Sequence, residues 1–509
     1  MGIIIPPEDA GKALGRFSGP DVVIVGTGPA GVVSALELAK AGLQVLMLEA
    51  GSEALDTDGS PFFNFEVNGP SHEVAFGMSL QMGGSTNLWS GRSARFEAGD
   101  ITMSRGWPFD REDLEDDYRH AEEILGIELE NADQQPEIPA GWKSACQRPL
   151  EIKRFTWSRP PRNFADVARR AVERFPELNV ILGARCVRLN YQGGVLQSLS
   201  VATSDGVQSV SARRFLLAAG GLESPRVMLA SGLGEGLPAL GRYLGTHPKG
   251  NVGKLELRRL ARLRYPLFSD TKIGDHWRRY GVGLEHSSRP AGLNHYLQLS
   301  PRFEKIGSSM LERAQQGLLA ARGPSTGRNR LEDAAILAGR VAFNALGRSG
   351  VFQGYASQLT LRGFFDQHPD PSNRIELQAS ADKFGVPQAA VQWKLGQHDY
   401  DSISAFMRII SEHISRSDIG EVRADLPHDP GELRLTGVHS HFMGTTRMGT
   451  GPGDSVVDGW GRVHGQERLF VSGPGLFRTY SYANPVLTIC ALALRVAKGV
   501  IHSLQEECA

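Results

Sequence analysis

The chain has 509 residues, of which 41% are apolar and 22% are charged, and its formal net charge at pH 7 is −1. This length predicts two or three lobes rather than one simple core. A nearly neutral charge disfavours nucleic acids and acidic membrane surfaces as partners, because these usually select a basic face.

The four cysteines lie far apart and include no Cys-x-x-Cys spacing, which disfavours a common zinc or redox-pair site and is typical of a reducing compartment. The N-terminus lacks a basic segment followed by a long apolar one. No window reaches the roughly 18–20 apolar residues needed to span a membrane. We therefore expect a cytoplasmic protein without integral membrane contact, either a monomer or a dimer.

The first strong pattern along the chain is strand–helix–strand over residues 21–51. The apolar run 22–25 predicts a buried parallel strand, and an amphipathic helix is expected over 29–40. A second apolar run at 44–48 predicts the next strand. This order is typical of the first half of a dinucleotide-binding domain.

Four residues in this unit are candidates for binding the dinucleotide. Gly26 permits a tight turn, Gly28 lets the backbone approach a pyrophosphate, and Gly31 lets helix and strand pack closely, while the helix N-terminus attracts phosphates. Glu49, about twenty residues further on, is placed to accept hydrogen bonds from a ribose, which favours NAD or FAD. A glycine-rich turn without a ligand is the alternative interpretation.

Two later segments extend the same sheet in our interpretation. Residues 215–229 predict a buried strand, a turn of small residues and a helix that starts at Ser224, with Pro225 in its first turn. Residues 469–500 predict a strand, a glycine-rich turn and a long helix that begins near Pro485. Elements from both ends of the chain would then return to one sheet. That discontinuity is common in flavoproteins and favours FAD over NAD.

The middle of the chain, residues 233–415, is expected to carry a substrate-binding sheet. Four segments in it alternate as half-buried strands do: 295–303, 355–365, 373–380 and 389–395. Residues 304–350 predict two helices and are too long for an ordinary loop, so they indicate an inserted element. This insertion would cover the active site, mediate assembly, touch a membrane surface or be disordered.

The segment HSHFMGTTRMG, residues 439–449, holds two histidines one residue apart. Histidine suits a catalytic base because its ordinary pKa lies near neutral pH. A His-x-His pair can also bind copper or zinc, but no matching cluster of ligands is visible in the sequence, so we expect no metal. A serine hydrolase is disfavoured because the chain has no Gly-x-Ser-x-Gly motif.

Together these motifs resemble the glucose–methanol–choline (GMC) family of FAD oxidoreductases. They run in the family's order over nearly the whole chain: GTGPAG with Glu49, GGSTNLWSGRSARF (83–96), GWPFDREDLEDDY (106–118), AAGGLESPRVMLASG (218–232), LGRYLGTHP (240–248), DPSNRIEL (370–377), HFMGTTRMG (441–449) and NPVLT (484–488). The resemblance is greatest to pyranose oxidases, including bacterial enzymes that oxidise the C3 hydroxyl of glucosides. The turn SGPG (472–475) is one reason, since most other members have Asp-x-Ser there.

The resemblance implies an α/β fold with a Rossmann-like FAD-binding domain assembled from discontinuous segments. It also implies a substrate-binding α+β lobe with a mostly antiparallel sheet. The expected division is 1–232 for FAD binding, with the flavin-attachment-type loop 83–96, and 233–415 for the substrate, with the insertion 304–350. Residues 416–509 would carry the catalytic histidine segment and return to the FAD-binding domain.

The resemblance also implies how FAD is held. Pyranose 2-oxidases attach the flavin covalently through a histidine in this loop, and the aligned positions here are Asn87 and Leu88. Neither can form that bond, so we expect non-covalent FAD. The further candidates for contact with FAD are Gly83, Gly84, Ser85, Asn87, Val187, Ala219, Gly473, Asn484, Pro485 and Val486.

The family's base lies four residues before the threonine of the Gly-Thr turn, and counting back from Thr445 gives His441. His439 shares the strand parity of His441 and is the second choice, either as a partner behind the base or as the base itself if the strand carries a bulge. Asn484 is implied to orient the substrate hydroxyl, and a helix N-cap is its ordinary alternative role. Gln298 is a candidate for binding sugar hydroxyls, although a solvent-facing position explains it equally well.

The activity that we expect is FAD-dependent oxidation of a sugar or glycoside. A secondary ring hydroxyl, at C3 in preference to C2, would become a ketone while O2 is reduced to hydrogen peroxide. A dehydrogenase that uses a quinone or another acceptor is one alternative. A flavin-bound interaction protein without turnover is a remote one.

Overall fold

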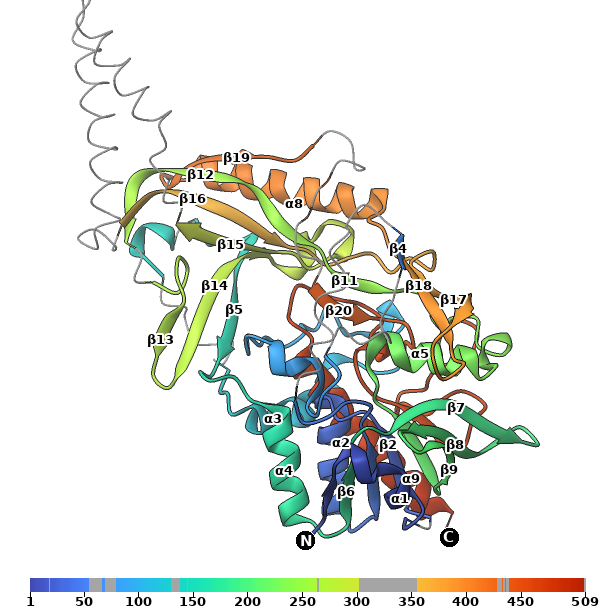
Figure 1. The fold of residues 1–509 in the computed structure, drawn as a ribbon. Coiled ribbons are helices and arrows are strands. Elements are labelled where there is room, and N and C mark those ends of the chain that lie inside the picture. Colours follow the sequence, from blue (N-terminus) through green and yellow to red (C-terminus); the bar gives the residue numbers. More distant parts are fainter. Residues whose placement is uncertain are drawn as a thin grey trace, which may run out of the picture.

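The computed structural model shows two lobes. Figure 1 shows one lobe around a parallel sheet, with both chain termini, and a second lobe in which helix α8 (Gln397–Arg416) crosses a long antiparallel sheet. The predicted insertion 304–350 lies outside the described residues. Those residues are 1–17, 19–54, 66–68, 79–129, 138–143, 145–262, 265–301, 355–427, 433, 435 and 439–507.

A six-stranded parallel sheet forms the core of the first lobe, in the order β1-β6-β3-β2-β10-β21. Its strands are β1 (Ile4–Ile5), β2 (Val22–Val25), β3 (Val45–Leu48), β6 (Leu178–Ile181), β10 (Arg214–Leu217) and β21 (Leu469–Val471). Every residue of β2, β3 and β10 is buried, as expected for parallel strands covered on both faces. The predicted discontinuous Rossmann-like sheet is confirmed.

Helices α2 (Pro29–Lys40), α3 (Glu115–Leu125), α4 (Phe164–Arg174) and α9 (Val486–Glu506) pack in this lobe, and α1 (Ala10–Leu14) is a short N-terminal helix. Among the described residues, α9 is long and apolar enough to cross a membrane by length and composition. Our expectation that no segment reaches that threshold is therefore wrong. Since 78% of its most apolar window is buried against α2, α3 and the sheet, packing inside the lobe accounts for the apolar composition.

Helix α5 (Gly220–Ala230) follows β10 and begins four residues earlier than predicted, so that Pro225 lies inside it. A proline cannot donate the hydrogen bond that the carbonyl of Gly221 would otherwise accept. The hydroxyl of Thr445 donates to that carbonyl oxygen instead, at 2.6 Å. A contact from a distant segment therefore satisfies the carbonyl that Pro225 leaves free.

A seven-stranded antiparallel sheet forms the second lobe, in the order β13-β14-β15-β16-β12-β19, with β5 beside β14. The strands are β5 (Leu150–Trp157), β12 (Lys249–Arg262), β13 (Thr271–Ile273), β14 (His276–Leu284), β15 (Tyr296–Pro301), β16 (Tyr355–Phe364) and β19 (Gly420–Ala424). Strands β5 and β19 come from outside 233–415. The sheet is therefore wider than the predicted middle segment.

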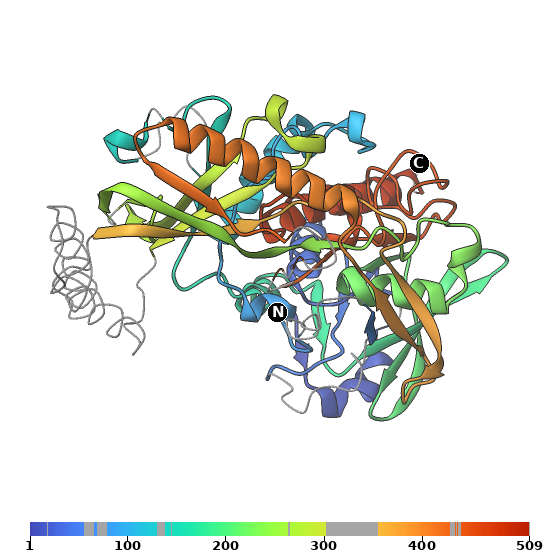
Figure 2. The same ribbon diagram turned by 90° about the horizontal axis from the view of Figure 1, so that it is seen from above.

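Helix α8 covers one face of this sheet, as Figure 2 shows from above. Ile403, Phe406 and Ile410 of the helix share an apolar core with Leu297 and Leu361 of the strands. The opposite face turns toward the first lobe, where the ring of Tyr296 stacks on Tyr482 with centroids 5.4 Å apart. The second lobe thus turns this sheet face toward the lobe that carries the glycine turn.

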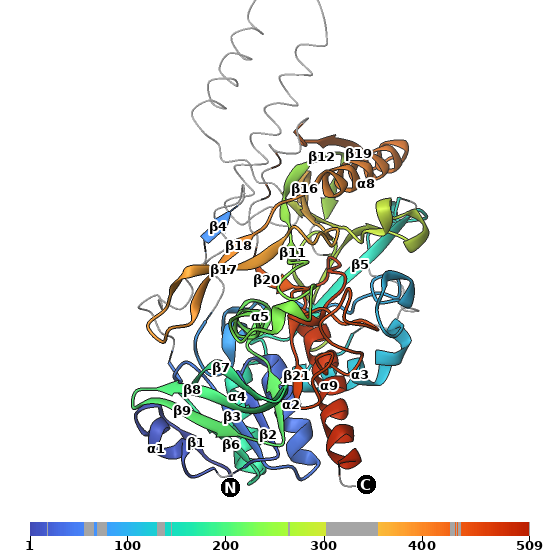
Figure 3. The ribbon, with the colours of Figure 1, turned by 90° about the vertical axis from the view of Figure 1, so that its right-hand side faces the viewer.

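Three small sheets complete the fold: β17 (Arg374–Ala381), β18 (Pro387–Gln392) and β4 (Glu66–Asn68); β7 (Arg185–Gln192), β8 (Val195–Thr203) and β9 (Gly206–Ser211); and β11 (Gly245–His247) with β20 (His439–Met443). The predicted strands at 373–380 and 389–395 thus form a separate sheet, beside α5 in Figure 3, rather than part of the substrate sheet. The β11–β20 pair lies between the two lobes.

Candidate active site

The glycine turn after β2 shapes one wall of a cavity in the first lobe. Gly26 has a φ of +102°, and a Cβ there would lie 2.7 Å from the carbonyl oxygen of Ala218. A Cβ on Gly31 would lie 2.0 Å from the carbonyl oxygen of Gly26, so only glycine lets α2 begin this close to the strand. Gly28 has no protein atom within 4 Å of its Cβ position. Its backbone is therefore bare toward the cavity that it lines.

Glu49 ends β3 at the same wall. Its Oε2 accepts hydrogen bonds from the backbone N–H and the hydroxyl of Thr27, and its Oε1 accepts one from the N–H of Gly51. Burial raises the pKa of Glu49, while these donors oppose the shift by stabilising the carboxylate. Glu49 lines the cavity, where a carboxylate oxygen can also accept a hydrogen bond from a ribose hydroxyl.

The loop after residue 79 forms another wall. Five of its residues line the cavity: Leu80, Gly84, Ser85, Thr86 and Trp89. Gly83 and Asn87 lie behind them, since the N–H of Gly83 donates to the hydroxyl of Thr27 and the amide of Asn87 donates to the carbonyl of Met82. These two predicted FAD contacts therefore hold the loop in place. Leu88 is 55% exposed and offers no nitrogen for a covalent flavin bond.

Strand β7 begins at the end of the cavity near Glu49. Ala184, Arg185 and Cys186 line it, and Arg185 pairs with Glu223 of α5 at 2.9 Å. Val187, which we predicted to contact FAD, packs with Ala202 and Val386 instead. The pairing of β7 with β8 is irregular between Cys186 and Arg188, so the position of Val187 does not follow from simple strand alternation.

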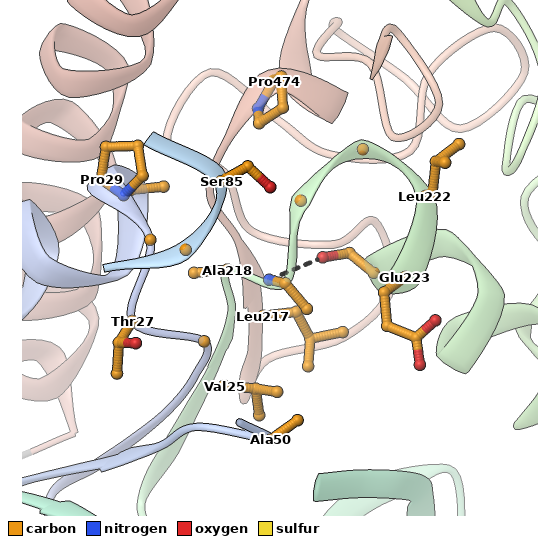
Figure 4. Close-up of a pocket in the computed structure, with 18 of the residues that line it drawn as sticks. Val25, Thr27, Pro29, Ala50, Ser85, Leu217, Ala218, Leu222, Glu223 and Pro474 are labelled. Atoms are coloured by element: carbon orange, nitrogen blue, oxygen red, sulfur yellow. Dashed lines mark hydrogen bonds between the residues drawn. The ribbon is translucent and has the colours of Figure 1, made fainter. Parts of the chain in front are cut away.

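Segments near the C-terminus close the remaining side. Figure 4 shows Thr27, Ser85, Glu223 and Pro474, from four separate parts of the chain, around one cavity. Three more predicted FAD contacts line it, namely Ala219, Pro485 and Val486. Gly473 adjoins Pro474 with a φ of +121°. Helix α9 begins at Val486 after Pro485, and no side chain caps it.

The donor set of this cavity fits FAD. The N-terminus of α2 has no side-chain cap, so its amides are available to a phosphate, and bare Gly28 stands directly before it. Within the described part of the chain, the buried hydroxyl of Ser79 has no protein partner and lines the cavity. Glu49 and the anion-binding turn therefore stand where the adenosine ribose and the pyrophosphate of a dinucleotide require them.

His441 of β20 also lines the cavity. Its Nδ1 lies 2.9 Å from Nδ1 of His247 on β11, and Nε2 of His247 lies 2.8 Å from the carbonyl oxygen of Tyr480. Burial, with a smaller contribution from Lys249, lowers the pKa of His247 to about 4, although the carbonyl of Tyr480 opposes the shift. Burial, His247 and Lys249 hold the pKa of His441 well below its ordinary value. Both rings are therefore neutral near pH 7.

These contacts assign the hydrogens of the two rings. A carbonyl oxygen only accepts, so Nε2 of His247 carries the hydrogen, and Nδ1 of this neutral ring is an acceptor. His441 must then donate from its Nδ1, which leaves its Nε2 without a hydrogen. His247, which we did not single out from the sequence, thus fixes the tautomer of His441. The motif LGTHP contains it, but the motif alone does not show what its histidine contacts.

The position of His441 depends on a close contact between β20 and α5. A Cβ on Gly221 would lie 2.0 Å from the carbonyl oxygen of Phe442, so only glycine lets the two elements meet. The pairing of β11 with β20 is irregular, because Gly245 pairs with Met443 while His247 pairs with His439. The side chain of His439 lies outside the described residues, so its role stays a prediction.

Asn484 lies next to the cavity-lining Pro485, and its side chain does not cap α9, so the alternative N-cap role is wrong. Its amide donates to the carbonyl of Arg92 at 2.9 Å, which leaves its second N–H for another acceptor. The guanidinium of Arg92 donates to Gln298 at 3.2 Å. Gln298 is only 9% exposed, so the solvent-facing alternative is wrong, and it lies on the sheet face that turns toward the first lobe.

Comparison with known proteins agrees with this arrangement. Residues 21–283, more than half of the chain, match the family described as FAD dependent oxidoreductase, and residues 369–493 match GMC oxidoreductase. Paromamine 6'-oxidase of Streptomyces fradiae is 25% identical over 95% of this chain and 92% of its own length. C-glycoside 3-oxidase of Arthrobacter globiformis is 32% identical over 24% of this chain and 23% of its own.

A solved structure shows the same fold. Pyridoxine 4-oxidase from Mesorbium loti superimposes with a TM-score of 0.60 and 17% identity, over 95% of this chain and 99% of that one. The sheet order, the FAD-compatible cavity and the two family matches are mutually consistent. The chain therefore belongs to the FAD-dependent oxidoreductases and is an enzyme of the GMC type that acts on CH–OH groups.

Proposed function

We propose that this protein is an FAD-dependent oxidase of sugars or glycosides in which Nε2 of His441 accepts the proton of the hydroxyl that is oxidised. The observation that carries this proposal is the hydrogen-bond chain from the carbonyl of Tyr480 through His247 to His441. It leaves one unprotonated nitrogen at the wall of the flavin cavity. The low pKa of His441 keeps that nitrogen available at neutral and mildly acidic pH.

Oxidation of an alcohol removes a proton from oxygen and a hydride from carbon. Bound FAD supplies the hydride acceptor. His441 accepts the proton, and His247 fixes its ring through the Nδ1 contact. The free N–H of Asn484 donates to the substrate oxygen and stabilises the negative charge that develops as the proton leaves. In this proposal both side chains act on one hydroxyl.

The oxidised position that we favour is a secondary ring hydroxyl, C3 before C2. A matching stretch of C-glycoside 3-oxidase supports C3, although that match covers about a quarter of each chain. The nearly full-length match to paromamine 6'-oxidase supports a 6'-hydroxyl as a second candidate. We propose O2 as the electron acceptor and hydrogen peroxide as the co-product, with a quinone-linked dehydrogenase as the alternative, and we propose that FAD is bound without a covalent link.

A substrate screen tests this proposal. The purified yellow protein is incubated anaerobically with sugars, alkyl and aryl glycosides and simple alcohols, and flavin absorbance near 450 nm is followed. Air is then admitted, peroxide is assayed, and the product is identified by NMR. We expect bleaching by sugars and a keto product. Bleaching by simple alcohols alone, or by no compound, would contradict the proposal, and an aldehyde product would transfer the reaction to the 6'-hydroxyl.

A further inference from the structure

The sheet face that looks toward His441 carries two adjacent rows of paired residues. The rows cross β12, β16 and β15, and they are Lys249–Phe364–Tyr296 and Asn251–Arg362–Gln298. Residues that pair across strands project from the same face, and so do residues two apart along a strand. Leu297, which lies between the two rows, and Leu361, which precedes Arg362, belong to the apolar core under α8. The two rows therefore form the polar face opposite that helix.

Positive charge dominates this face. The charges of Arg362 and Arg92 lie close enough to Lys249 to disfavour its protonated form, and Lys249 in turn affects both His247 and His441. Asp270 neutralises Arg92 through two contacts of 2.7 and 2.9 Å. Arg159 also reaches Asp270 at 3.3 Å, so this carboxylate is already shared between two cations.

Among the described residues, Lys249 and Arg362 have no such counter-ion. Neither side chain forms an ion pair or a hydrogen bond with a described residue, and both lie against the ring of Phe364, at 5.6 and 5.7 Å from its centroid. Burial, together with Arg362 and Arg92, lowers the pKa of Lys249 to about 7. A half-buried cation beside other cations costs free energy. An apolar side chain at the same point of the sheet would avoid that cost.

A neutral sugar would gain little from this charge, and an amino sugar would be repelled by it. We infer that the substrate carries an anionic group, a carboxylate or a phosphate, which Lys249 and Arg362 bind while His441 acts on a hydroxyl of the same molecule. This inference rests on the proposed sugar oxidation. The ring of Phe364, which lies near both cations, offers an apolar surface for the sugar ring. Asn251 and Gln298 lie beside Arg362 and supply neutral donors for further hydroxyls.

Four matched sugars test the inference on the wild-type holoenzyme: methyl glucoside, methyl glucuronide, glucose 6-phosphate and glucosamine. The first two differ only in a CH2OH group against a carboxylate. We expect kcat/KM for at least one anionic sugar to exceed that for methyl glucoside by roughly 10- to 100-fold. The free energy of a hydrogen bond to a charged group corresponds to a factor of this size. Glucosamine should be the poorest substrate. Whichever of methyl glucuronide and glucose 6-phosphate has the higher kcat/KM shows whether the site recognises a carboxylate or a phosphate.

Two variants locate the effect. Arg362→Gln should raise KM for the anionic sugar roughly tenfold or more, while kcat and the values for methyl glucoside change less than about threefold. Because Lys249 also acts on the pKa of His441, Lys249→Gln is read only from the ratio of kcat/KM between the anionic sugar and methyl glucoside, which should fall roughly tenfold. Lys254→Gln, on the same strand, is the control for the loss of one positive charge and should change neither. Retained FAD absorbance and unchanged melting behaviour show that each variant is folded.

The results separate this inference from the function on which it rests. If no sugar reduces the enzyme, the proposed function fails. If methyl glucoside is oxidised as well as the anionic sugars, the function stands and the anionic subsite is wrong. If both Gln variants lower kcat equally for neutral and anionic sugars, the cations act on the chemical step rather than on an anionic substituent, and the inference is again refuted.

Discussion

The hydrogen bond between His247 and His441 allows a sharp test of the assigned tautomer. His247 is only 2% exposed, and its ring accepts from His441 and donates to the carbonyl of Tyr480. His247→Phe keeps a ring of similar shape but removes both polar contacts. The Nδ1–H of His441 then lacks its acceptor, and the ring is free to adopt the other tautomer, in which Nε2 carries the hydrogen and cannot accept a proton.

The size of the effect follows from the lost contact. A buried donor left without its partner costs about 1–3 kcal/mol. At about 1.4 kcal/mol for each tenfold change in rate, the variant should reduce its flavin roughly 5- to 150-fold more slowly. His247→Asn is the matched control, because the Asn side-chain oxygen can lie near the original Nδ1 position and accept from His441. It should recover most of the rate that Phe loses.

Anaerobic stopped-flow absorbance at 450 nm with a saturating sugar measures this rate directly. The FAD content and the melting temperature of each variant are measured alongside, so that misfolding is recognised. A Phe variant that binds FAD and reduces it at the wild-type rate would refute the tautomer assignment. Equal losses in Phe and Asn would show that His247 acts through ring packing rather than as a hydrogen-bond acceptor.

Three further predictions follow from the site. Because the pKa of His441 is held well below 6.5, kcat/KM for a neutral sugar should stay flat as pH falls through 6.5, and a decline with a midpoint near 6.5 would contradict the assignment. Glu49→Gln replaces one oxygen that accepts from Thr27 or Gly51 by an NH2 group, so FAD should be lost at least about tenfold more readily during dialysis, as measured by the 450 to 280 nm absorbance ratio. Lys249→Met should stabilise the protein by on the order of 2–4 kcal/mol at pH 6, because burial and its neighbours lower the folded pKa to about 7. The cost of Lys249 is fully present below pH 7 and disappears as pH rises toward the unfolded pKa near 10.5, so the variant and the wild type should converge in urea unfolding at pH 10.

The nucleotide-binding unit could be predicted from the local sequence pattern. The hydrophobic period and the glycine spacing predicted α2 at its observed bounds, the turn at Gly26 and the close packing at Gly31. These features depend on residues near one another in the chain. The return of β10 and β21 to one sheet was also visible, because each is an apolar run followed by a turn and a helix.

Long-range contacts were not predictable in this way. Strand β5 pairs with β14 more than a hundred residues away, and nothing within its own sequence names that partner. Helix α5 begins before Pro225 because the hydroxyl of Thr445, from a distant part of the chain, donates to the carbonyl oxygen of Gly221 that the proline leaves free. The same limit explains why His247 was missed, since its contact with His441 spans 194 positions. Val187 was misplaced because its orientation depends on the register of β7.

The central claim is that His441 accepts the substrate proton, and single-turnover reduction of the His441→Ala variant tests it most directly. The purified variant should remain yellow, because FAD is bound chiefly by other residues of the cavity. Under anaerobic conditions with a sugar that bleaches the wild type, its absorbance at 450 nm should not fall on the same time scale. Bleaching of His441→Ala at the wild-type rate, or loss of bleaching in His439→Ala alone, would contradict the account.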